Sequence, residues 1–74
     1  MHRERVPLQW AMSVGNQGIA LMYLAKRRED AAMAEAALGQ INTAFEAMRE
    51  GGHRPYAAHF EQQLPIARAL LARL

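Results

Sequence analysis

The sequence predicts an all-α fold, an antiparallel helical hairpin followed by a third helix, in one domain over residues 1–74. Three segments carry apolar residues at alternating spacings of three and four, which is the period of one helix face. Prolines, glycines and one charged stretch separate these segments, as expected at helix ends. Val, Ile and Thr are sparse while Ala, Leu, Met, Glu, Gln and Arg dominate, so no strand is expected.

The first helix is expected over residues 8–26. Pro7 suits a helix start, because the N–H that proline lacks would have no partner there. The stretch from Lys26 to Asp30 places cations at one helix end and a capping carboxylate at the next helix start. It contains neither Gly nor Pro, so a single fused helix in a swapped dimer is the alternative. The apolar face of the first helix comprises Ala11, Val14, Gly18, Leu21 and Ala25.

The second helix is expected over residues 30–50 and completes a hairpin over residues 8–50. Gly51 and Gly52 end it, because glycine readily adopts the left-handed conformation that closes helices. Its apolar face comprises Ala34, Ala37, Leu38, Ile41, Ala44, Phe45 and Met48.

A closing helix is expected over residues 55–73, with Pro55 in its first turn. Pro65 falls inside this helix and removes the hydrogen bond to the carbonyl of Glu61, at a cost of about 3 kcal/mol. We therefore expect a bend near residues 62–64. The apolar face of this helix comprises Ala57, Phe60, Leu64, Ala67, Leu71 and Leu74.

The composition argues against a catalytic centre, a cofactor site and a metal site. The chain has no cysteine, three histidines and seven scattered carboxylates, so we expect no enzyme active centre and no cofactor. His53 and His59 are six residues apart, which does not place two ligands on one helix face, so no metal site is expected. Glu46 and Glu50 alternate with Arg49 and are interpreted as a solvated surface.

Charge and hydropathy limit the partners. The net charge is +2, and most cations have a carboxylate close by in sequence, so nucleic acid is not the expected partner. The longest apolar run, Ile19 to Ala25, is far shorter than the roughly 20 residues that cross a bilayer. No signal peptide is recognisable, so we expect a cytoplasmic protein that does not bind a membrane.

The first two helices resemble the long-helix variety of the tetratricopeptide repeat. Residues 7–13 read PLQWAMS and residues 16–21 read NQGIAL, close to the first helix of that repeat. In the second helix Ala37, Ile41 and Ala44 supply the small, large and small residues of the repeat in the right order. The third helix matches only over residues 62–67. The resemblance implies a right-handed α–α array, of which this chain forms one hairpin and a degenerate closing helix.

In tetratricopeptide repeats the first helix of each hairpin lines a concave surface that binds peptides. By this resemblance Asn16 is the best polar candidate, since an amide can both donate to and accept from a peptide backbone. Gly15 and Ile19 stand where some members carry basic residues that clamp a C-terminal carboxylate, so that specificity is not expected. The positions implied to contact peptide are Met12, Gly15, Asn16, Ile19, Met22 and Tyr23.

We therefore expect a non-catalytic protein-interaction or assembly module, which docks a partner peptide or stacks on other repeats. A chain of this mass buries only roughly 7,500 Å² on folding, so self-association, most simply as a two-fold dimer, is expected to complete the core. The residues expected at this interface are Trp10, Phe45, Phe60, Leu64 and Leu71. A small basic helical protein that binds nucleic acid is the alternative function, with phosphate contacts from Arg49, Arg54, Arg68 and Arg73.

Overall fold

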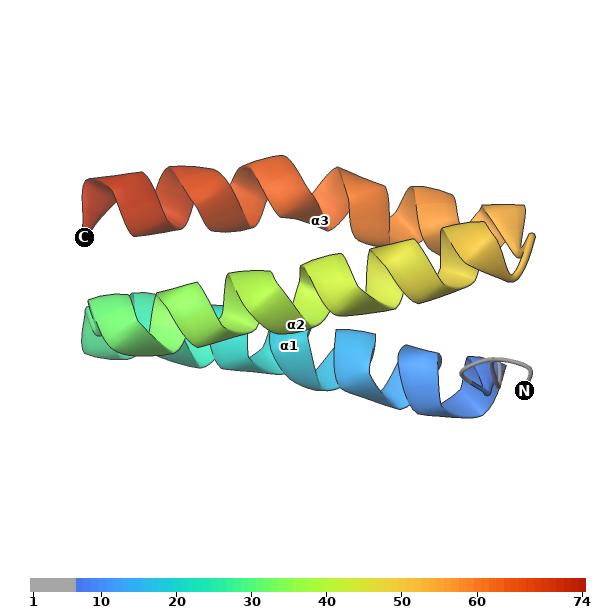
Figure 1. Cartoon of the computed structure of the whole chain (residues 1–74). Helices are drawn as coiled ribbons and strands as arrows, with labels where there is room; N and C mark the ends of the chain where they lie inside the picture. Colours follow the sequence, from blue (N-terminus) through green and yellow to red (C-terminus); the bar gives the residue numbers. More distant parts are fainter. Residues whose placement is uncertain (1–6) are drawn as a thin grey trace, which may run out of the picture.

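A computed structural model describes residues 7–74, which form three α-helices and no strand. The helices are α1 (Leu8–Arg28), α2 (Ala31–Glu50) and α3 (Arg54–Arg73). Figure 1 shows that α1 and α3 run in the same direction, while α2 runs in the opposite direction and packs against both. The predicted all-helical fold and the packing of the first two helices are confirmed.

The α1–α2 turn reverses the chain within two residues. Glu29 adopts the left-handed conformation, with a φ of 52°, and the Asp30 N–H donates to the carbonyl of Ala25 over 3.1 Å. The Asp30 carboxylate then accepts a hydrogen bond of 3.0 Å from the N–H of Met33, which caps α2. The first two helices are therefore separate, and the fused-helix alternative does not apply to this structure.

Two further features concern α3. Gly52 has a φ of 74° and closes α2, and the His53 N–H donates to the carbonyl of Met48 over 2.9 Å. From Arg54 the helix continues through Pro65 to Arg73 without interruption. Pro65 and Glu61 are both exposed, so the break in the hydrogen-bond ladder lies on the solvent side of α3 rather than in the core.

The α1–α2 interface is built from very small residues. A Cβ atom added at Gly18 would lie 2.9 Å from Cγ1 of Ile41, and one added at Gly15 would lie 2.8 Å from Cβ of Ala44. The two backbones therefore approach each other too closely for any side chain at these positions. The fully buried alanines of the two helices are Ala11, Ala25, Ala37 and Ala44.

Phe60 places α3 on this hairpin. Its ring is fully buried and occupies the space that a side chain at Gly15 would need. Away from this contact α1 and α3 meet little, and each packs mainly against α2. The result is an elongated slab of 42 × 23 × 16 Å rather than a closed three-helix bundle.

The glycines of this fold predict opposite effects of the same substitution. Gly15→Ala inserts a methyl group against Phe60 and Ala44, so we expect a loss of about 1–3 kcal/mol in the free energy of unfolding. Gly39→Ala meets no atom within 4 Å, so we expect a gain of about 1 kcal/mol from helix propensity alone. Urea unfolding followed by circular dichroism measures both, and a Gly15→Ala variant as stable as wild type contradicts the close packing.

Candidate functional site

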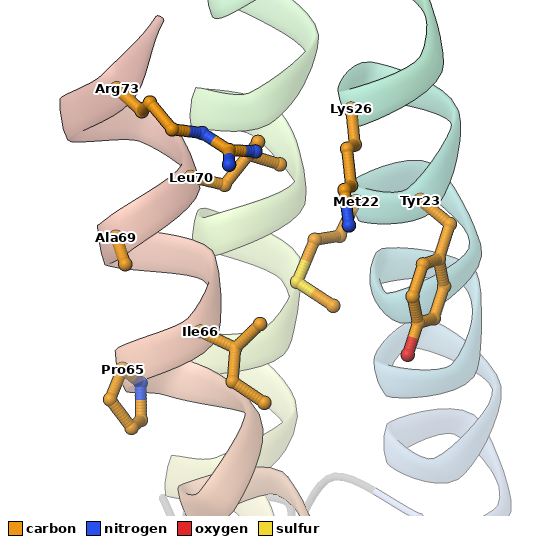
Figure 2. Close-up of a pocket in the computed structure, with 8 residues that line it drawn as sticks. All are labelled: Met22, Tyr23, Lys26, Pro65, Ile66, Ala69, Leu70 and Arg73. Atoms are coloured by element: carbon orange, nitrogen blue, oxygen red, sulfur yellow. The ribbon is translucent and has the colours of Figure 1, made fainter.

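A groove lies between α1 and α3, which contact each other much less than each contacts α2. It has a volume of about 450 Å³. Figure 2 shows its two walls, with α2 behind them. The lining residues are Met22, Tyr23 and Lys26 of α1 and Pro65, Ile66, Ala69, Leu70 and Arg73 of α3.

Helix periodicity places these side chains. Met22 and Leu70 are 2% and 5% exposed and form the floor of the groove. Ile66, one turn before Leu70, is 51% exposed and faces Met22 across the groove in Figure 2. Tyr23 is 56% exposed and forms the opposite rim. The groove therefore keeps large apolar side chains accessible to another molecule.

Two cations stand at one end of the groove. Lys26 follows Met22 by one helical turn, and Arg73 follows Leu70 by about one turn. Because α1 and α3 run in the same direction, both side chains lie at the same end, as Figure 2 shows. Among residues 7–74, no acidic residue lines the groove and neither cation has an ion-pair partner. Both residues also lie in the last turn of their helices, where the helix dipole favours positive charge.

The peptide-contact positions implied by the tetratricopeptide resemblance divide into two groups. Met22 and Tyr23 line the groove. The other four precede it along α1: Met12 and Ile19 are half-buried, Asn16 is exposed, and Gly15 is buried beneath Phe60. Gly15 therefore offers no surface to a ligand.

Sequence reasoning missed Lys26 and the whole α3 wall. The resemblance covers the first helix well but the third only weakly, so it carried no position in α3. A signal was present in the sequence, because Ile66, Ala69, Leu70 and Arg73 recur at spacings of three and four beside the core face of that helix.

The five residues expected at a dimer interface lie in different environments. Phe60 and Leu64 are 0% and 5% exposed and belong to the core of the single chain, so they leave almost no surface for a second copy. Phe45 and Leu71 are half-buried against this core. Trp10 is 47% exposed and remains available to a partner.

The arginines expected to contact phosphate do not form one stripe. Arg49 is paired with Glu46 and lies 5.7 Å from the centre of the Phe45 ring. Arg54 and Arg68 share one side of α3, but Arg73 lies about 140° round the helix from Arg68 and lines the groove.

His53 and His59 pack against aromatic rings. The ring centres of His53 and Tyr56 are 4.8 Å apart, and those of His59 and Phe60 are 5.1 Å apart. Among the residues that the structure describes, no three His, Asp or Glu side chains gather closely enough to hold a metal ion. None of the three helices is long and apolar enough to cross a membrane.

Comparisons of the chain with protein-family models, with curated proteins and with solved structures find no match. The groove is therefore the feature from which a function is inferred.

Lys26 and Arg73 are predicted to contribute little to stability. Both are exposed and neither has an ion-pair partner in the described part of the chain, so neutralisation removes only the helix-dipole interaction. We expect Lys26→Gln with Arg73→Gln to change the free energy of unfolding by less than about 1 kcal/mol. Arg27→Gln with Arg68→Gln makes the same charge change outside the groove and serves as the control in urea unfolding. A much larger loss in the first variant only would contradict this prediction and would show that the Lys26 and Arg73 side chains stabilise the fold through packing.

Proposed function

We propose that this protein is a non-catalytic docking module that binds a segment of another protein in the groove between α1 and α3. The observation that supports this function is the exposed apolar surface of Ile66 and the Tyr23 ring above the buried floor of the groove, beside two cations without an ion-pair partner among residues 7–74. Grooves with an apolar centre and charged residues at the edge are typical of protein-binding surfaces.

The groove offers little for catalysis. In the part of the chain that the structure describes, its polar side-chain groups are the Tyr23 hydroxyl and the two cations, and the lining contains no Asp, Glu, His, Ser or Thr. A reaction needs an acid, a base or a nucleophile near the reacting atom. Binding without chemistry is the function that these residues support.

The finer assignment is to a tetratricopeptide-like array. The hairpin of α1 and α2 with a third helix beside it agrees with one repeat and the first helix of the next. In this proposal the groove is the concave side of the array, and the opposite side of α1 stacks on a preceding repeat or on a second copy.

Self-association is the second part of the proposal. Trp10 and Leu24 are 47% and 36% exposed, and they lie on the side of α1 turned away from the groove residues Met22 and Lys26. Exposed tryptophan is enriched at protein interfaces, where it supplies a large part of the binding free energy. We propose a homodimer formed through this side of α1.

A displayed library of random peptides, sorted on the full chain, tests docking in the groove. We expect binders whose affinity disappears with Ile66→Asp, because a carboxylate there stands in the apolar part of the groove. Gln62→Asp is the matched control, since Gln62 is exposed on the same helix but does not line the groove. Binders that respond equally to both variants, or no binders, would argue against this function.

Light scattering across the micromolar range tests self-association. We expect a mass that is a multiple of 8.3 kDa and that falls on dilution. Trp10→Glu is expected to lower the mass at every concentration, because it places a charge in the apolar contact. Gln9→Glu introduces the same charge at the neighbouring exposed position and is expected to have a smaller effect. A chain that stays at 8.3 kDa throughout would show that it completes its core alone.

A further inference from the structure

We propose that the segment bound in the groove is an amphipathic α-helix with an acidic residue at the end that lies between Lys26 and Arg73. This inference rests on the docking function proposed above. It adds the conformation and the charge of the partner.

The dimensions of the groove fit a short stretch of helix. The α3 wall extends from Pro65 to Arg73, about 12 Å at 1.5 Å per residue, which is roughly two helical turns. The exposed apolar residue Ile66 lies toward one end of this length, and Lys26 and Arg73 arise from their helices at the other end. A helix with apolar residues three or four positions apart, followed one turn later by an acidic residue, presents the same order of groups.

The walls of the groove favour a helix over an extended strand. Both walls are α-helices, whose backbone N–H and C=O groups are bonded within the helix and cannot pair with a strand. An extended peptide pressed against Met22 and Leu70 would bury backbone groups without partners, since the floor there is apolar. A helical segment pairs part of its backbone groups internally, so it buries fewer unpaired groups than an extended peptide would. Asn16, whose amide could bond an extended backbone, lies outside the groove lining.

The charges at the end of the groove favour a carboxylate. Lys26 and Arg73 project from opposite walls, and Figure 2 shows the Arg73 side chain reaching toward α1. The helix dipole favours positive charge in the last turn of α1 and of α3. On α1, Arg27 and Arg28 lie in the same turn as Lys26 but do not line the groove. The dipole alone therefore does not explain why a cation lies in the groove. A carboxylate placed between two cations is attracted by both, whereas a neutral residue there makes only weaker hydrogen bonds and a basic residue is repelled. A nucleic acid would meet an apolar floor with only two cations, so the acidic helix fits this surface better.

Peptides selected from the library for sensitivity to Ile66→Asp provide the test. Each is labelled with a fluorophore, and its binding to the full chain is measured by anisotropy at low and high salt. We expect the selected sequences to share apolar residues three or four positions apart and a Glu or Asp at one end, and to gain helical circular dichroism when bound. Replacing that Glu with Gln is expected to weaken binding about two- to fivefold for each charge–charge interaction that it removes.

The variant that removes both cations isolates their contribution. In Lys26→Gln with Arg73→Gln, the Glu and Gln peptides are expected to bind with nearly equal affinity, and salt is expected to have little effect. The Arg27→Gln with Arg68→Gln control is expected to keep the difference between the peptides. Urea unfolding of each variant establishes that the fold is retained.

The peptide selection gives different results if the proposed acidic helix is wrong and if the proposed docking function is wrong. Groove-dependent binders that are neutral or basic, or that contain proline and remain extended, overturn the acidic helix while docking stands. Absence of groove-dependent peptides overturns both proposals, and saturable binding of decanoate in that case would assign the groove to an amphiphilic small molecule. An equal Glu-to-Gln effect in wild type and in the double cation variant also overturns the role of Lys26 and Arg73.

Discussion

The close approach of α1 to α2 is the constraint on which the rest of the molecule depends. Gly15 and Gly18 leave no room for a side chain, and the buried alanines around them bring the two backbones together along the length of the hairpin. The space that Gly15 leaves open is filled by Phe60 from α3. One missing side chain therefore both tightens the hairpin and creates the socket that receives the third helix.

That socket also sets the register between α1 and α3. The two helices run in the same direction and rise by the same distance per residue, so residues equally far beyond Gly15 and Phe60 lie at similar heights. Met22 is seven residues beyond Gly15, and Ile66 and Leu70 are six and ten residues beyond Phe60. Their meeting in one groove follows from the Phe60 contact, and so does the presence of both cations at one end.

The sequence predicted the helices well and the groove only in part. Helices follow from local periodicity, and the stops at Gly51 and Gly52 are local signals, so these features were accessible. The role of Phe60 could not be predicted from the sequence, because its apolar spacing is the same whether it contacts Gly15 or a second chain. The sequence also predicts a bend near residues 62–64 caused by Pro65; α3 remains helical through this stretch, with the missing hydrogen bond on its solvent side. Lys26 and Arg73 are far apart in the sequence, and only the packing of α3 brings them to the same groove.

The groove and the open, slab-like shape of the molecule both follow from the incomplete packing of α3 against α1. A third helix that packed fully against α1 would bury Ile66 and Tyr23 and would close the space above Met22. Such closure would stabilise the chain by burying apolar area, at about 25 cal/mol per Å². Here α3 packs mainly on α2 and meets α1 at Phe60, in its first half. In its second half Ile66, Ala69 and Arg73 line the groove instead, and the cation among them has no ion-pair partner on α1. A ligand that covers this surface buries the apolar area that α3 leaves exposed. Because such a ligand binds only the folded chain, its binding raises the free energy of unfolding.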